Sequence, residues 1–360
     1  MMLVTLGNSA ARPLVQRGSN FDFGTFSHDG QSILATELSG SLTRIVSIPV
    51  NGGTPQILFT VANLVWYLDS GRDGSVYMSL TDRPSELVRR PLSGGEVEHI
   101  ASFPQQSESD TITVLPDGRT VLSAVTSGRP RLVLVEKGKE PVRLVSTAEE
   151  TSTPAAAAGT NEVAFVIGPA PHQTIAIAEV ASGRIARRIP LNKGEIQSLA
   201  SSPDGATLYA AAGGSVWAIP LTGELRNIRA GDSVTVDPSG RHLVIGIYEG
   251  SKFKLFRVPT DSGGDGGPEQ EIMISSTKPL MSYPLSPNAL NSEGSLLHPL
   301  SPVDSWFNAI GLVNTATGKL TFVRCDDISD YHSMAWLPDG RIMALHIGLR
   351  STLWRFQPQK

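Results

Sequence analysis

A short turn phrase recurs along this chain and limits how it can fold. In each copy an alternating apolar stretch is followed by Pro-Asp-Gly or a variant, and then by another apolar stretch. Asp-Gly supplies the positive φ of a tight β-turn, and the flanking alternation with period 2 predicts strands. The phrase therefore predicts a β-hairpin at every copy. The copies are Pro116–Gly118, Pro203–Gly205, Pro338–Gly340, His28–Gly30, Arg72–Gly74, Pro238–Gly240, and the degraded Gly159–Thr160 and Ser292–Gly294.

A second turn follows in each unit about 20 residues later, which makes two hairpins, or four strands, per repeat. Examples are Ile48–Gly53, Arg90–Gly95 and Ile219–Gly223. Repeated four-stranded units of about 45 residues are typical of a β-propeller, in which neighbouring sheets bury each other's faces. No amphipathic helix is evident, so we expect an all-β chain.

We therefore predict a single closed β-propeller of eight four-stranded blades over the 360 residues. Seven blades are the alternative if Pro287–Gly294 is an insertion. The last blade has chain enough for only three strands, so we expect the N-terminal strand Arg12–Gln16 to pair with Thr352–Phe356 and close the ring. The predicted blades are 19–60, 61–105, 106–147, 148–192, 193–229, 230–277, 278–325, and 326–360 together with 1–17.

Composition excludes several classes of protein. A net charge of −4 does not favour nucleic acid or an anionic membrane as partner, and the single Cys325 cannot form an internal disulfide or a CxxC pair. No apolar run reaches the length of a membrane span, and Met1–Leu6 does not resemble a signal peptide. We expect a monomer without a cofactor, in a compartment that stays open between bacterial periplasm and cytoplasm.

One position in the repeats predicts a site. Counting eight residues back from each turn glycine reaches the start of each innermost strand, and these starts should converge around the mouth of the central channel, opposite the Asp-Gly turns. The predicted ligand-binding residues are Asp22, Trp66, Asp110, Gln197, Asp232 and His332, with Ser152 and Met281 in the degraded units.

Loops between second and third strands reach the same face and add further candidates, because exposed aromatic and Arg side chains favour binding. Alternatively, the carboxylates only accept hydrogen bonds within their own loops. The loop candidates are Arg83, Arg129, His172, Tyr248, Trp306 and His346.

The phrases Phe26–Gly30 and Ala200–Gly205, with the Ile-Pro turns, resemble the WD40-like (PD40) repeats of TolB-type propellers. The same repeats occur in propeller regions attached to some bacterial serine/threonine kinases. The resemblance implies a binding, sensor or scaffold role, with a protein or small ligand as partner.

No catalytic motif is present: the chain has no Gly-x-Ser-x-Gly elbow, phosphate loop, His-Glu-x-x-His or kinase catalytic loop. We therefore expect a non-catalytic binding module. The alternative is a hydrolase or lyase working at the channel mouth, such as a metal-dependent lactonase, with Asp22, Asp110, Asp232 and His332 holding a divalent ion.

Overall fold

The computed structural model shows an all-β chain, and within the described residues no helix occurs. Likewise, that part of the chain contains no helix that could cross a membrane. The described residues are 2–4, 11–14, 21–39, 42–82, 84–103, 111–126, 129–156, 160–249, 252–260, 268–275, 280–281, 283–301, 305, 307–325, 329–348 and 350–357.

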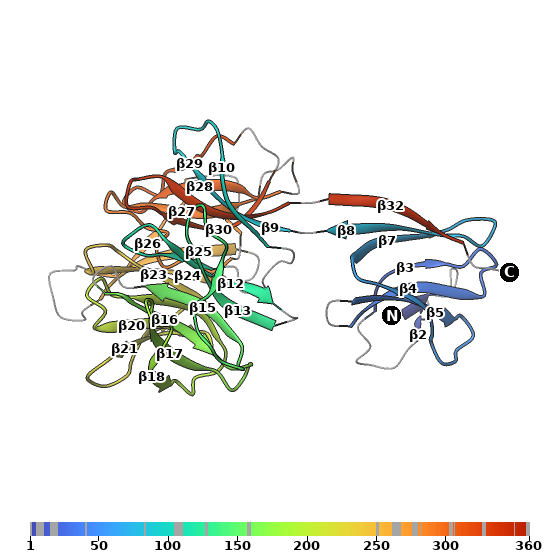
Figure 1. The fold of residues 1–360 in the computed structure, drawn as a ribbon, viewed down its shortest axis with the longest axis horizontal. Coiled ribbons are helices and arrows are strands. Elements are labelled where there is room, and N and C mark those ends of the chain that lie inside the picture. The colour runs from blue at the N-terminus through green and yellow to red at the C-terminus, as the bar shows by residue number, and fades with distance from the viewer. Residues whose placement is uncertain are drawn as a thin grey trace. The chain divides into compact units, whose positions relative to one another are not determined.

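The strands form antiparallel sheets, as the turn phrases predict (Figure 1). Among the described residues there are eight sheets of three or four strands, besides a two-stranded ribbon. The turn glycines have the positive φ that the hairpins need; Gly118 has φ 83° and Gly205 has φ 74°. The prediction of an all-β chain built from repeated hairpins is confirmed.

The chain divides into two compact units, which are described separately. Unit 1 comprises 1–83 and 349–360, and unit 2 comprises 84–348. The sequence predicted one domain over the whole chain, whereas the backbone passes between the units twice, after β8 and after β31.

Unit 1 contains one four-stranded sheet, one three-stranded sheet and the ribbon. Ile48, Val46 and Ala35 belong to one of its two apolar clusters. Its strands are β1 (Met2–Val4) with β2 (Ala11–Pro13); β3 (Phe21–Phe26), β4 (Ser32–Ser39), β5 (Leu42–Pro49) and β6 (Gln56–Val61); and β7 (Leu64–Ser70), β8 (Val76–Asp82) and β32 (Arg350–Phe356).

Unit 2 contains six sheets. They are β30 (Asp330–Trp336), β31 (Ile342–Ile347), β9 (Ser85–Arg90) and β10 (Glu98–Phe103); β11 (Ile112–Val114), β12 (Thr120–Thr126), β13 (Arg129–Val135) and β14 (Val142–Arg143); β15 (Thr151–Ala156), β16 (Glu162–Ile167), β17 (Thr174–Glu179) and β18 (Ile185–Pro190); β19 (Ile196–Ser201), β20 (Thr207–Ala212), β21 (Ser215–Pro220) and β22 (Arg226–Ala230); β23 (Ser233–Val236), β24 (His242–Glu249), β25 (Lys252–Pro259) and β26 (Gln270–Ile272); and β27 (Ser295–Leu300), β28 (Ala309–Asn314) and β29 (Leu320–Phe322).

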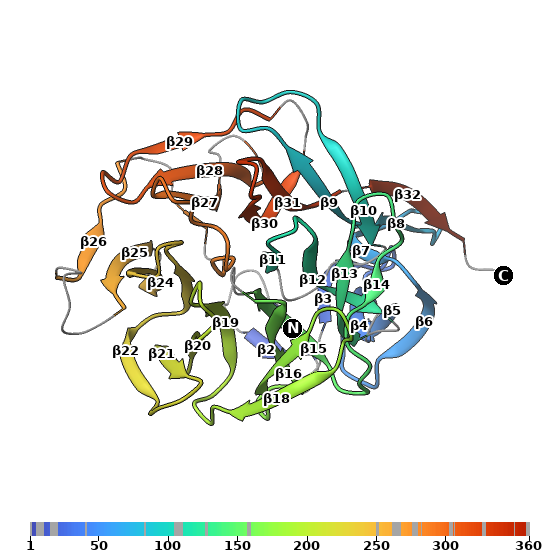
Figure 2. The same cartoon turned by 60° about the vertical axis from the view of Figure 1, so that its left-hand side comes forward.

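Successive sheets of unit 2 pack face to face through apolar clusters, and Figure 2 shows their inner strands around a common centre. Phe165 of β16, for example, packs against Val121 and Leu132 of the preceding sheet. The sheet of β27 packs on that of β30 through Leu297 and Met334, and the latter packs on the sheet of β11. Each sheet therefore buries both faces.

The predicted closure by the N-terminal strand is not found among the described residues, and Val15 and Gln16 lie outside them. β2 pairs with β1, with Arg12 opposite Leu3, and Thr352–Phe356 lies in β32, which pairs with β8. The edge of β31 is covered by β9, with Ala344 opposite Val88. Among the described residues β32 is the edge strand of its sheet, in the order β32-β8-β7, and no strand covers its outer side.

The grouping of two blades also differs from the prediction. The predicted blade 61–105 is divided, because β7 and β8 pair with β32 whereas β9 and β10 complete the sheet of β30 and β31. The weak unit around Pro287–Gly294 has a three-stranded sheet of its own. Eight sheets match the predicted number of repeats, and the six of unit 2 pack on one another in turn; a single ring of eight blades is not shown.

The pairing of β9 with β31 can be tested by a cross-link. In a Cys325→Ser background, Val88→Cys with Ala344→Cys places two thiols directly opposite each other, where Cβ atoms lie about 5 Å apart. We expect a disulfide on mild oxidation, detected by peptide mapping. Val88→Cys with Leu345→Cys is the control, because adjacent residues of a strand point to opposite faces. Cross-linking of the control but not of the Val88–Ala344 pair would contradict this register.

Candidate functional site

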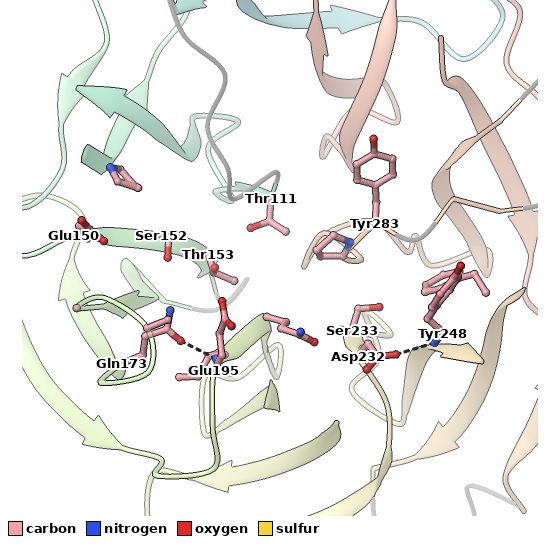
Figure 3. A pocket seen from close by; sticks show the side chains of 17 residues that line it. Thr111, Glu150, Ser152, Thr153, Gln173, Glu195, Asp232, Ser233, Tyr248 and Tyr283 are labelled. Atoms are coloured by element: carbon pink, nitrogen blue, oxygen red, sulfur yellow. Dashed lines mark hydrogen bonds between the residues drawn. The ribbon is translucent and has the colours of Figure 1, made fainter. Parts of the chain in front are cut away.

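A cavity of about 640 Å³ opens within unit 2, at the end of the sheets where the innermost strands begin. Its lining comes from the starts of these strands and from the loops between second and third strands, as the repeat geometry predicts. Figure 3 shows these side chains around the hollow. The polar and aromatic lining residues include Thr111, Glu150, Ser152, Thr153, Gln173, Glu195, Gln197, Asp232, Ser233, Tyr248, Phe253 and Tyr283.

Two of the predicted site residues, Gln197 and Asp232, line this cavity together. Ser152, at the same position of another repeat, lines it as well, and so does Tyr248 from the predicted loop set. The convergence follows from topology, because equivalent strands of successive sheets begin at the same end. Two of the six predicted site residues thus line the cavity, and their role in binding stays a prediction.

A β-bulge marks the predicted position in several repeats. Gln197 is the extra residue between Ile196 and Ser198 of β19, and His332 is the extra residue between Tyr331 and Ser333 of β30. Asp22 and Trp66 lie in bulges of β3 and β7, and Ser152 borders one in β15. A bulge re-aims side chains and disrupts alternation, which explains why polar residues stand at this point of otherwise apolar strands.

Glu195 and Gln197 approach the cavity from the start of β19. The backbone N–H of Ile196, between them, donates to Oε1 of Gln173 at 2.7 Å, which joins this start to the neighbouring loop (Figure 3). The Glu195 side chain is exposed and points into the hollow. In the described part of the chain this carboxylate has no hydrogen-bond or ion-pair partner, so its charge is available to a ligand.

Asp232 has a structural contact as well as a place in the lining. Its Oδ2 accepts a hydrogen bond from the backbone N–H of Tyr248 at 2.7 Å (Figure 3). The contact joins the start of β23 to the end of β24, so it is a cross-strand bond and not the within-loop bond that the sequence left open as an alternative. The second carboxylate oxygen does not make this bond and remains for other contacts.

Gly246 allows Tyr248 and Phe253, which form an aromatic wall of the cavity, to approach it closely. A Cβ at this position would lie 2.4 Å from the ring of Phe253 and 2.6 Å from Oγ of Ser233. Phe253 is paired directly with Tyr248 across β24 and β25, so the two rings stand beside Asp232. Any side chain at Gly246 would displace this wall.

His332 lies behind Tyr283 and does not line the cavity itself. Its side chain is buried, its Nε2 is 2.9 Å from Oδ2 of Asp330, and its ring meets the edge of Tyr283 at a centroid distance of 4.8 Å. Asp330 also accepts from the backbone N–H of Asn308 at 2.8 Å, and Nδ2 of Asn308 lies 3.4 Å from the Tyr283 hydroxyl. His332 thus supports Tyr283, which does line the cavity.

The remaining predicted residues lie elsewhere. Asp22 and Trp66 belong to unit 1, whereas Asp110, Arg83 and Trp306 lie outside the described residues. Of the loop set, Arg129 and His172 are exposed, next to the lining residues Pro130 and Gln173. His346 is buried, and its Nε2 lies 3.5 Å from Oε2 of Glu86. Met281 accepts a hydrogen bond from His298 through its backbone carbonyl.

Sequence reasoning missed Glu150, Glu195 and Thr111. Glu150 and Glu195 each stand two residues before the aligned positions Ser152 and Gln197, and alternate residues of an extended segment share a face. Counting ten residues back from Gly205 instead of eight would have found Glu195. Within the described residues, no three His, Cys, Asp or Glu side chains form a group that could hold a metal ion.

The sheets and the cavity among their inner strands define a β-propeller. Among solved structures, putative TolB from Agrobacterium tumefaciens is similar, with a TM-score of 0.58 and 13% identity over 74% of this chain and 99% of that one. TolB from Acinetobacter baumannii has a TM-score of 0.47 with 11% identity, covering 88% and 80%, and a chain of a nidogen/laminin complex has 0.44 with 11%, covering 72% and 84%.

The putative TolB superimposes well enough to support an argument about the fold. It confirms the predicted resemblance to TolB-type β-propellers as a resemblance of fold. At 13% identity it says nothing of function. No protein-family model matches the chain, and no curated protein matches it in sequence.

His298, behind Phe253, makes stability depend on pH. The two rings stack with centroids 5.0 Å apart, and burial lowers the pKa of His298 to about 4, although the Met281 carbonyl 2.7 Å from Nε2 opposes this. The unfolded chain takes up this proton near pH 6.5, so the neutral ring stabilises the fold fully above that pH. Stability should fall by about 3 kcal/mol between pH 6.5 and pH 4.

Urea unfolding across this pH range measures the effect. His298→Gln keeps a donor for the carbonyl and does not titrate, so the wild type should lose more stability than this variant on acidification. His172→Gln, at an exposed loop position, is the matched control and should behave as wild type. Equal acid sensitivity of wild type and His298→Gln would disprove the assignment.

Proposed function

We propose that this chain is a non-catalytic binding module, which uses the cavity of unit 2 to bind a protein segment or a small ligand. The observation that carries the proposal is the convergence of polar and aromatic side chains on one concavity of about 640 Å³. A concavity with a few convergent polar groups is the usual form of a ligand site.

The structural neighbour supports the fold on which this proposal rests. A propeller presents loops of many repeats to one shared end, so a single ligand can contact several sheets at once. At the Asp-Gly turns charged side chains pair with each other, as Arg119 does with Asp117, whereas the cavity end offers Glu, Gln, Ser and Tyr side chains around one hollow. A protein partner or a peptide is the best match for such an end.

Two further points stay predictions. The non-catalytic character rests on the missing catalytic motifs, and a role as the sensor or scaffold of a bacterial signalling protein, such as a serine/threonine kinase, rests on the repeat resemblance.

A blocked cavity tests the proposal. Gln197 is exposed at the bulge of β19, so Gln197→Trp should obstruct part of the cavity without disturbing the apolar core. We expect wild-type protein to enrich binders from a random peptide display library, and Gln197→Trp to lose them while keeping its thermal midpoint. Glu293→Trp, in an exposed turn before β27, is the control and should keep them. Equal retention by Gln197→Trp would rule out the cavity as the binding site.

A further inference from the structure

We propose that the cavity binds an organic cation, namely an alkylammonium or guanidinium group of a small molecule or of a Lys or Arg side chain. This inference rests on the proposed function and specifies its ligand. Three kinds of side chain in the lining support it: carboxylates, buried hydroxyl groups and aromatic rings.

The charged side chains among the described lining residues of the cavity are acidic. Glu150, Glu195 and Asp232 line it, and none of the described lining residues is Lys or Arg. Arg131 lies near Glu150 and offsets part of its charge, while its guanidinium donates to the backbone carbonyls of Ala148 and Glu149. The negative charge of the lining therefore rests mainly on Glu195 and Asp232. The cavity therefore presents a negative potential, which favours a cationic ligand group.

Two buried hydroxyl groups in the lining call for a hydrogen-bonding ligand. Thr111 is 3% exposed and Ser233 is 1% exposed, and among the described residues neither hydroxyl oxygen has a hydrogen-bond partner. Thr111 projects from the start of β11 toward the hollow (Figure 3). A buried polar group without a partner costs about 1–3 kcal/mol, and a bound donor would remove this cost.

The available groups are mainly acceptors. Oε1 of Gln173 and one oxygen of Asp232 already accept backbone N–H groups, while the Glu195 carboxylate and the two hydroxyl oxygens can accept from a ligand. Ammonium and guanidinium groups donate only, with three and five N–H groups respectively. Their chemistry therefore complements this set better than that of an anion or a neutral carbonyl.

Aromatic rings complete the match. Tyr248 is 50% exposed beside Asp232, and Phe253 and Tyr283 form neighbouring parts of the lining. A cation is attracted to the face of such a ring within about 6 Å of its centroid. Carboxylates and rings together favour an organic cation, whose methylene groups contact the rings, over an inorganic ion.

Calorimetry with the full chain tests the inference. The probes are agmatine as a free cation, the peptides Ac-Gly-Arg-Gly-NH2 and Ac-Gly-Lys-Gly-NH2, and the neutral Ac-Gly-Gln-Gly-NH2. We expect the cationic probes to bind at least about tenfold more tightly than the neutral peptide, with affinity falling as salt rises. Tighter binding of the peptides than of agmatine identifies a protein side chain as the source, and the reverse order identifies a free small molecule.

The variants locate the binding. Glu195→Gln with Asp232→Asn removes two charges and keeps the acceptor for Tyr248, and it should weaken cation binding at least about tenfold. Glu293→Gln, at the exposed turn, should leave binding unchanged. Thr111→Val should raise the thermal midpoint of the free protein and weaken cation binding, because it removes an unpartnered hydroxyl.

The outcomes separate this inference from the proposed function. Peptide binders that are lost in Gln197→Trp but contain no Lys or Arg, with no preference for the cationic probes, would overturn the cation assignment and leave the binding site intact. Cation binding unaffected by the double variant would also overturn it. Binders that Gln197→Trp retains would instead remove the proposed function itself.

Discussion

Burial of both faces of each sheet is the constraint on which the rest of unit 2 depends. A four-stranded sheet with apolar side chains on both faces needs a neighbour on either side. Six apolar clusters between successive sheets of unit 2 meet this need, and the sheet of β30 and β31 contacts both the sheet of β27 and that of β11. The radial arrangement then brings the starts of the innermost strands together.

The cavity follows from this arrangement. Strand starts and the loops between second and third strands supply its lining at one end of the sheets, and bulges in β15 and β19 interrupt the apolar alternation there. Polar groups can face the hollow because the bulges free them from the sheet pattern. The packing of the sheets thus determines where a ligand can bind, and side chains at the strand starts determine its chemistry.

The sequence predicted local structure better than strand pairing. The hairpins and the number of sheets follow from turn chemistry, which acts over a few residues. The pairing of β9 with β31, for example Val88 with Ala344, joins segments far apart in the chain, and nothing in the local pattern specifies it. The repeat count gave Gln197 and Asp232 correctly as neighbours of one cavity. It missed Glu195 and placed His332 in the lining, because the count cannot tell which side chains of a bulge turn inward.

Hydrogen–deuterium exchange with and without Ac-Gly-Arg-Gly-NH2 tests the central claim most directly, because it reports where on the full chain a cation binds. The account predicts slower exchange at the cavity segments 150–153, 195–197, 232–233 and 248–249. The turns at the opposite end of the sheets, 116–118, 203–205 and 338–340, should be unchanged. Protection confined to these turns, or to unit 1, would contradict the account.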